Sequence, residues 1–183
     1  MWGDSLSLDT GYSDHSDWFF QTMFVCATVS IVSGAVAERI KIWPFFIFAF
    51  LMSGFIYPIS MGWQWGGGWL AELGFSDFAG STLVHSTGGA AALAGIMLLG
   101  ARYGRFDSKG EAKAIKPFAA SSIPLVTVGV FILWLGWFGF NGGSQLAIGT
   151  FDDAVAVSSI FINTNLAASM SMVGEKGDPN KVD

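Results

Sequence analysis

The stretch from Phe78 to Ala101 reads FAGSTLVHSTGGAAALAGIMLLGA, twenty-four residues without a single charged side chain. At about 1.5 Å of rise per residue, a helix of this length crosses the roughly 30 Å hydrocarbon core of a bilayer. Small residues fill its centre, and in lipid such side chains let helix backbones approach one another closely. The sequence therefore predicts a transmembrane helix near residues 80–101 that packs against neighbouring helices on several sides.

Four further runs of at least twenty uncharged residues occur in the chain, and each is long enough to span a bilayer. We place the five spans near residues 18–38, 42–63, 80–101, 117–140 and 154–173. The fold class that this pattern predicts is an all-α integral membrane protein with about five transmembrane helices.

The composition of the 183 residues supports the same class. Hydrophobic residues make up 52% and charged residues 13%, whereas soluble domains carry about 25% charged residues. Such a composition argues against a soluble domain or a disordered chain, and a net charge of −5 argues against a nucleic-acid partner. The single cysteine, Cys26, excludes a disulfide framework and a cysteine-built metal site.

All nine lysine and arginine residues fall on one side of this predicted array. They occupy the second, fourth and sixth segments outside the spans, and the first, third and fifth segments hold only acidic charges. The positive-inside rule then places the N-terminus outside and the C-terminus in the cytoplasm. Residues 1–17 become an extracellular or periplasmic segment, residues 18–173 a helical domain in the plasma or inner membrane, and residues 174–183 a cytoplasmic polar tail.

Two ionisable residues stand out in and before the third span. His85 lies about one and a half turns into the small-residue helix, where a charged side chain is costly and a neutral one needs a partner. It is either a hydrogen-bonded packing residue or a functional group, and its position leaves both interpretations open. Asp77 precedes the same helix, where it can cap the free N–H groups or present its charge above His85; we favour the cap.

Other polar residues near the spans receive structural interpretations. Glu38 and Arg39 end the first span, and we expect an ion pair at this boundary without a transport role. Residues 163–165 read NTN and are expected to supply hydrogen bonds between helices. The glycines in Asn141-Gly142-Gly143-Ser144 allow a turn or a close backbone approach, and Ser144 adds a hydroxyl beside an aromatic cluster.

The sequence contains no phosphate-binding loop, zinc-protease motif or nucleophile elbow. We therefore expect no enzyme activity, no cofactor and no metal site. Aromatic residues at the outer boundary and one membrane-depth histidine suit a channel or transporter for a small solute, with cation–π contacts at its mouth.

Five blocks of sequence, in their order and their spacing along the chain, resemble one known family. They are Phe20–Phe24, Gly34–Arg39, Trp65–Gly68, Asp77–His85 and Gly136–Ser144. These blocks are similar to those of the ammonium transporter family (Amt/Mep/Rh), and the resemblance covers roughly residues 15–170. The DFAGSTLVH block is very specific, and Trp65 points to the Amt/Mep branch.

The resemblance implies roles for seven residues along one permeation path. They are the ammonium-recruitment residues Phe24, Trp65 and Ser144, the gating residues Phe20 and Phe140, the pore histidine His85 and the essential acid Asp77. Ammonium held between the aromatic faces would lose its proton, and neutral ammonia would then pass the histidine.

The resemblance also implies an architecture larger than five spans. Members of the family have about eleven helices in two inverted halves, with the permeation path near the midplane between them. They form homotrimers with one pore in each subunit. A regulatory PII-type protein is the partner implied on the cytoplasmic side of full-length members.

Compared with that architecture, the chain covers roughly the third to the seventh helix, and a second pore histidine is absent from it. We therefore expect an incomplete transporter chain. Two alternatives stay open: an ammonium-binding or sensing module that does not conduct, and a non-conducting structural fragment that pairs with a separately encoded half. An enzyme is the least favoured class.

Overall fold

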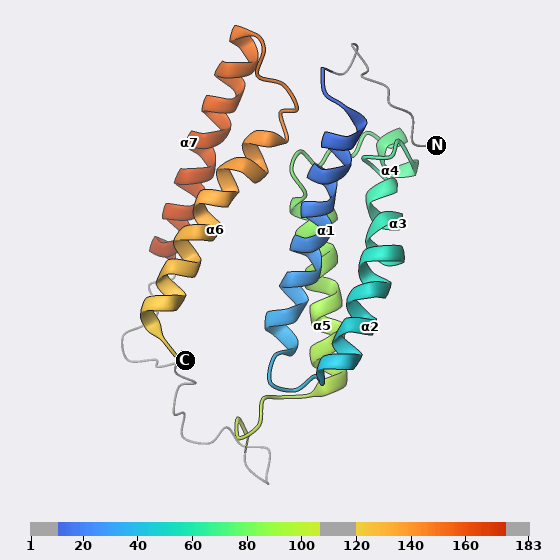
Figure 1. Ribbon diagram of the computed structural model, residues 1–183, viewed down its shortest axis with the longest axis vertical. Coiled ribbons are helices and arrows are strands. Elements are labelled where there is room, and N and C mark those ends of the chain that lie inside the picture. The colour runs from blue at the N-terminus through green and yellow to red at the C-terminus, as the bar shows by residue number, and fades with distance from the viewer. Residues whose placement is uncertain (1–10, 107–119, 175–183) are drawn as a thin grey trace. The chain divides into compact units, whose positions relative to one another are not determined.

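The computed structural model describes residues 11–106 and 120–174 of the chain (Figure 1). The chain consists of two compact units, Met1–Phe106 (unit 1) and Asp107–Asp183 (unit 2). Within the described residues, five helices are long and apolar enough to cross a membrane, as the sequence predicts. They run over Asp14–Val36, Ile42–Gly62, Ser81–Leu99, Ile123–Gly143 and Phe151–Ser171.

Helix α1 (Asp14–Val36) begins four residues before the predicted span. The hydroxyl of Ser13 accepts a hydrogen bond of 3.2 Å from the Ser16 N–H, and Asp14 and Asp17 place negative charge in the first turn. A polar cap and acidic residues in the first turn stabilise a helix N-terminus. The helix therefore begins inside the acidic segment, residues 1–17, that the sequence places before the first span. The first ten residues of that segment lie outside the described residues.

The second span consists of three consecutive helical segments. These are α2 (Ile42–Leu51), the π-helix η1 (Met52–Ile56) and α3 (Tyr57–Gly62). At the end of the π-helix, the N–H of Tyr57 donates to the carbonyl of Met52, five residues earlier. This wider turn is the mark of a π-helix and is rare outside short insertions in α-helices. A glycine-rich turn and the short helix α4 (Trp69–Glu72) follow.

The third span begins with a second π-helix, η2 (Ser81–Ser86), and continues as α5 (Thr87–Leu99). It packs along α1, and Figure 1 shows the two helices side by side. A Cβ atom placed on Gly88 would lie 2.8 Å from the carbonyl oxygen of Thr28, so the approach of the two backbones requires glycine. The predicted close packing of the small-residue helix is confirmed against α1.

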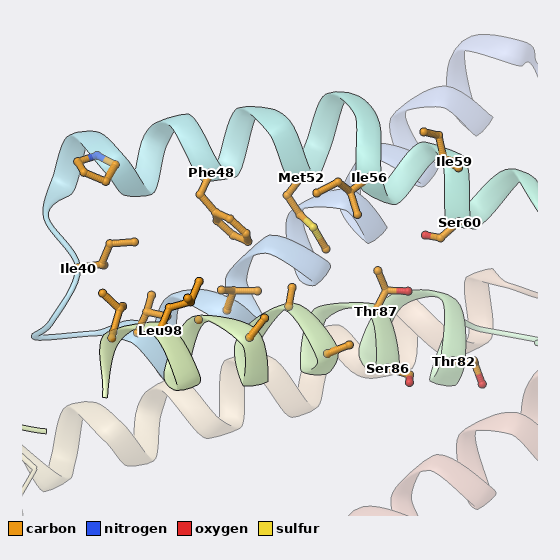
Figure 2. A pocket seen from close by; sticks show the side chains of 18 of the residues that line it. Ile40, Phe48, Met52, Ile56, Ile59, Ser60, Thr82, Ser86, Thr87 and Leu98 are labelled. Atoms are coloured by element: carbon orange, nitrogen blue, oxygen red, sulfur yellow. The ribbon is translucent and has the colours of Figure 1, made fainter. Parts of the chain in front are cut away.

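Another face of α5 lines an apolar groove of about 910 Å³, and α2, η1 and α3 form the opposite wall (Figure 2). Ile40 and Leu98 lie at one end of the groove, and hydroxyl-bearing residues such as Ser60 and Thr87 lie at the other. The side chain of Met52 points across it toward α5. Within unit 1 the third span therefore packs closely against α1 and also contacts α3 through η2, and the groove lies along the face between them.

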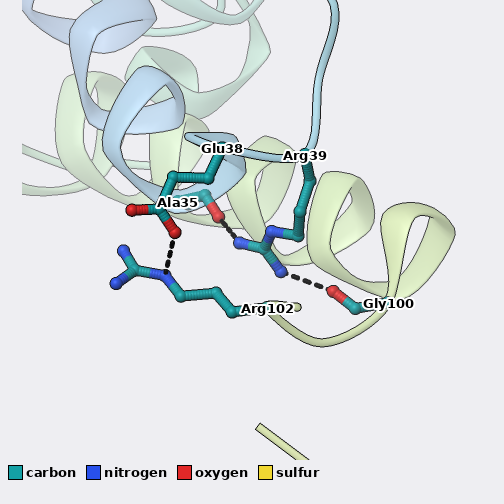
Figure 3. A network of polar contacts seen from close by, with 5 residues as sticks. All are labelled: Ala35, Glu38, Arg39, Gly100 and Arg102. Atoms are coloured by element: carbon teal, nitrogen blue, oxygen red, sulfur yellow. Dashed lines mark hydrogen bonds and ion pairs between the residues drawn. The ribbon is translucent and has the colours of Figure 1, made fainter. Parts of the chain in front are cut away.

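Figure 3 shows the polar contacts that join the ends of α1 and α5. The guanidinium of Arg39 donates hydrogen bonds to the carbonyls of Ala35 and Gly100, at the C-terminal ends of these helices. The Glu38 carboxylate lies 3.8 Å from Nε of Arg102. The expected boundary ion pair is therefore formed by Glu38 with Arg102, because the charge of Arg39 is bound by helix carbonyls that carry partial negative charge.

Unit 2 is a hairpin of two long helices, α6 (Ile123–Gly143) and α7 (Phe151–Gly174). The start of α6 is later than the predicted residue 117, and residues 117–119 lie outside the described residues. The reason is local, because the Ser122 hydroxyl accepts from the Leu125 N–H at 3.4 Å and Pro124 follows at the second helical position. Both features favour a helix N-terminus.

Two contacts between α6 and α7 match the expectations for their polar residues. The Asn141 side-chain amide donates to Oγ1 of Thr164 over 3.0 Å, which confirms a hydrogen bond between helices. A Cβ on Gly142 would lie 2.3 Å from Cε1 of Phe161, so glycine at this position lets the Phe161 ring of α7 lie against the backbone of α6. The predicted tail, residues 174–183, lies outside the described residues apart from Gly174.

Candidate functional site

Three of the predicted site residues in unit 1 are aromatic and contact one another edge to face. The ring centroids of Phe20 and Phe24 are 4.8 Å apart, and those of Phe24 and Trp65 are 5.4 Å apart. The ring planes meet at 79° and 76°, the T-shaped arrangement that aromatic pairs prefer. Phe24 is 2% exposed, so the core of unit 1 holds the middle ring of the cluster in place.

A hydrogen bond fixes Trp65, which lies in the turn between α3 and α4. Its Nε1–H donates to the backbone carbonyl of Asp77 over 2.8 Å. The indole also borders Gly80, because a Cβ on that glycine would lie 3.2 Å from Cη2 of the ring. The aromatic cluster is therefore attached directly to the segment that begins the third span.

The Asp77 side chain caps the start of η2. Its Oδ1 accepts hydrogen bonds from the backbone N–H groups of Gly80 and Ser81 at 2.8 and 3.0 Å. Its Oδ2 accepts from those of Thr82 and Leu83 at 2.9 and 2.8 Å. A helix start leaves four N–H groups without a partner in the helix, and this one carboxylate accepts from four. The geometry is that of the cap that the sequence interpretation favours.

This carboxylate is also an ionised group in a protected place. Asp77 is 5% exposed. Burial opposes its ionisation, but the four backbone N–H donors outweigh that effect and hold the pKa of Asp77 below its ordinary value. The end of unit 1 that carries the aromatic cluster thus also carries a buried negative charge.

His85 lies in η2 and is half-buried. Its Nδ1 is 3.1 Å from the carbonyl oxygen of Gly80, and its backbone N–H donates to the same oxygen over 3.0 Å. The N–H of Gly80 in turn donates to Asp77. One glycine therefore links the capping acid to the histidine.

The two remaining predicted site residues are neighbours at the end of α6 in unit 2. Ser144 follows the helix, and its hydroxyl donates to the carbonyl of Phe140 over 2.8 Å. The ring centroid of Phe140 is 6.4 Å from that of Trp137. The Ser144 oxygen keeps lone pairs that can accept a further hydrogen bond.

Unit 1 alone brings together five of the seven predicted site residues. They are Phe20, Phe24, Trp65, Asp77 and His85. Because Phe140 and Ser144 belong to unit 2, the three-residue recruitment site stays a prediction. Sequence reasoning overlooked Gly80, and the available signal was a glycine three residues after a capping aspartate, where a left-handed turn leads into a helix.

The groove of Figure 2 is separate from this assembly, since none of the seven predicted site residues lines it. Among the described residues, no group of three or more His, Cys, Asp or Glu side chains could hold a metal ion. The candidate functional site of unit 1 is therefore the chain of contacts from the aromatic cluster through Asp77 to His85.

Five apolar helices, with an aromatic cluster and a buried acid at a helix start, define a multi-pass helical membrane protein. The sequence model described as the Ammonium Transporter Family matches residues 3–175. The chain belongs to this family.

Individual relatives are similar over most of the chain. Ammonium transporter Amt2 of Archaeoglobus fulgidus is 43% identical over 166 residues, which cover 85% of this chain and 34% of that protein. Ammonium transporter 1 member 3 of Oryza sativa subsp. japonica is 40% identical over 181 residues, covering 88% and 36%. The ammonium transporter of Aquifex aeolicus is 40% identical over 164 residues, covering 90% and 35%. The chain thus spans about a third of the length of these curated relatives.

Proposed function

We propose that this chain takes part in ammonium transport across the plasma or inner membrane, with its N-terminus outside and its C-terminus in the cytoplasm. The observation that carries the proposal is the edge-to-face pair of Phe24 and Trp65, whose indole donates to the backbone carbonyl of the buried acid Asp77. Ammonium is a small cation, and aromatic faces close to a negative charge are suited to attract it.

The first step is recruitment of ammonium at the outer mouth by Phe24, Trp65 and Ser144. A cation–π contact contributes about 0.5–2 kcal/mol, which offsets only part of the hydration that ammonium loses. A charge in the hydrocarbon region is far more costly than a neutral solute. Release of a proton at the mouth therefore allows neutral ammonia to continue past the gating rings of Phe20 and Phe140.

His85 is the proposed pore histidine on this path. An imidazole nitrogen that accepts hydrogen bonds can bind the N–H groups of ammonia or take up a proton. Potassium has no proton to release, so it would be rejected at this step. Asp77 supports the path by capping η2, which carries His85, and by holding Trp65 through its backbone carbonyl.

The same family membership supports assembly as a homotrimer in the membrane and contact with a regulatory PII-type protein on the cytoplasmic side. Chemical cross-linking of the protein in lipid tests the first proposal, since a trimer gives a ladder that ends at three subunits. A pull-down with purified PII-type protein tests the second.

A second candidate is an ammonium-binding or sensing module, or a non-conducting half, because the chain has only one histidine within its predicted spans. Binding and flux separate these functions. We expect methylammonium to bind the lipid-reconstituted chain by calorimetry and labelled methylammonium to enter proteoliposomes. Binding without flux would favour the second candidate, and absence of both would contradict the proposal.

Two variants test the assigned roles. Trp65→Leu should weaken methylammonium binding, whereas Trp69→Leu, which alters an exposed tryptophan outside the cluster, should not. His85→Ala should reduce flux and leave binding at the mouth intact. Equal binding by the Trp65→Leu and Trp69→Leu proteins would contradict the proposed aromatic recruitment site. Unchanged ammonium selectivity in His85→Ala would contradict the proposed role of the histidine.

A further inference from the structure

The carbonyl oxygen of Gly80 is the point at which the capped helix start meets His85. It accepts backbone hydrogen bonds from Val84 and His85, both at 3.0 Å. It also lies 3.1 Å from Nδ1 of the His85 ring. The histidine thus contacts one carbonyl with both its backbone and its side chain.

The π-helical turn explains why this contact exists. In an α-helix the N–H of residue 85 would donate only to the carbonyl of residue 81, four positions earlier. In η2 the N–H of His85 reaches back five residues to Gly80. The wider turn therefore pairs His85 with a residue from before the helix, in the segment that Asp77 holds.

Gly80 adopts a conformation that other residues would not tolerate here. Its φ angle is +92°, in the left-handed region that favours glycine. A Cβ at this position would also lie 2.4 Å from Cγ2 of Val84 and 3.2 Å from Cη2 of Trp65. The N–H of Gly80 donates to Asp77 over 2.8 Å, and its carbonyl accepts from Val84 and His85. Hydrogen bonds therefore orient the peptide groups on both sides of this residue.

The contact decides which ring nitrogen carries the proton. A carbonyl oxygen is only an acceptor, so a nitrogen 3.1 Å away makes a favourable contact only as an N–H donor. A neutral imidazole has a single N–H, and it must then be on Nδ1. Nε2 is consequently the acceptor nitrogen of the neutral ring.

We propose that Gly80 is a positioning residue that fixes His85 in the Nδ1–H tautomer and makes Nε2 the acceptor nitrogen. The functional consequence rests on the proposed role of His85. Ammonium has four N–H donors and no acceptor, so a histidine can bind it, or take its proton, only through an unprotonated nitrogen. The same glycine borders Trp65, so one residue contacts both the aromatic cluster and the histidine ring.

The tautomer can be measured in the wild-type chain without any transport assay. The full chain is labelled with 15N-histidine, reconstituted in lipid and studied by NMR at about pH 9, where an ordinary histidine is neutral. We expect Nδ1 of His85 to resonate as a protonated nitrogen and Nε2 as an unprotonated one. The exposed His15 is the internal comparison, and His85→Ala assigns the signals. A His85 ring protonated on Nε2, or a mixture equal to that of His15, would overturn the proposal.

Three glycine substitutions test whether Gly80 is the cause. Gly80→Ala should lose the Nδ1–H signature. Gly89→Ala adds a methyl group to the same span where nothing lies within 4 Å, and Gly74→Ala adds one at a φ of +80° that is also open. Both controls should keep the signature. A Gly80→Ala protein that retains it would overturn the role of Gly80, and if that variant does not fold, the wild-type spectrum still decides the tautomer.

The outcomes also separate this inference from the proposed function. A wild-type His85 with the expected tautomer in a chain that binds no methylammonium would contradict only the proposed function. Methylammonium binding and flux with His85 protonated on Nε2 would contradict only the role of Gly80.

Discussion

The two ends of unit 1 each place one charged side chain over helix termini, but they use opposite charges. At one end the Asp77 carboxylate accepts hydrogen bonds from four N–H groups where η2 begins. At the other end the Arg39 guanidinium donates to carbonyls where α1 and α5 end. Helix N-termini carry partial positive charge and C-termini partial negative charge, so one physical rule accounts for both choices.

The difference between the ends lies in what else each charge touches. Asp77 caps a single helix and holds Trp65 through its backbone, so the stability of this end is coupled to the aromatic cluster. Arg39 connects two helices, and these two hydrogen bonds reach no predicted site residue. Substitutions at the Asp77 end should therefore affect both folding and the site, and substitutions at the Arg39 end should affect folding first.

The largest effect is expected from Asp77→Ala. Four backbone N–H groups lose their acceptor at a position that is 5% exposed, and we expect a loss of about 3 kcal/mol in the free energy of unfolding. Denaturant titration of the protein in detergent micelles measures it. Asp77→Asn is the matched control, because it keeps one acceptor oxygen and should lose less. Equal stability of the wild-type and Asp77→Ala proteins would refute the cap.

The next effect is expected at the opposite end, from Arg39→Met. It removes two charge-assisted hydrogen bonds and a cation from two helix C-termini, for an expected loss of about 2 kcal/mol. Arg39→Lys should lie between the two proteins, because one ammonium lacks the fork that reaches two carbonyls. The same denaturant titration applies. A lysine variant as stable as the wild type would show that charge alone is sufficient.

Acid titration separates the contributions of the two ends to stability. Because the pKa of Asp77 is lowered in the folded protein, its carboxylate contributes stability above the ordinary aspartate pKa of about 3.9, and this contribution is lost as the pH falls through the lowered pKa. An arginine guanidinium stays charged throughout this range. Asp77→Asn should thus reduce the acid dependence of the unfolding free energy, and Arg39→Met should leave it unchanged. Parallel pH curves for all three proteins would contradict this assignment.

The smallest effect is expected from the ion pair of Glu38 and Arg102. Their side chains are 64% and 39% exposed, and such a pair contributes about 0–1 kcal/mol. Arg102→Met should therefore change the stability far less than Arg39→Met does, and added salt should remove the difference. A loss as large as that of Arg39→Met would mean that the ion pair, and not the carbonyl contacts, holds the ends of α1 and α5 together.

The features that were predicted correctly depend on short stretches of chain. Five uncharged runs identify the spans, since a charge in hydrocarbon is costly in any fold. The cap formed by Asp77 is also local, because its acceptor atoms and the N–H groups lie within six residues. The early start of α1 was missed although Ser13 and Asp14 signal it, because residues 1–17 were interpreted as an extracellular or periplasmic segment that ends where the span begins.

The features that were missed depend on packing between segments. The π-helices η1 and η2 are not set by residue propensity, and the contact of Gly80 with His85 exists only because η2 has the wider turn. The ion pair of Glu38 also depends on packing between segments. Arg39 is next to Glu38 in the sequence, but its guanidinium binds the carbonyls of α1 and α5, so Glu38 pairs with Arg102, which follows α5.

For this chain, hydropathy and helix capping settled which segments are long and apolar enough to enter a bilayer and which charges stand at their ends. Both act within one segment, so they can be evaluated residue by residue along the chain. The edge-to-face contact of Phe24 with Trp65, the choice of Arg102 by Glu38 and the link from Trp65 through Gly80 to His85 came only from the fold. These contacts join residues whose meeting depends on how helices pack, and packing is a property of several segments together.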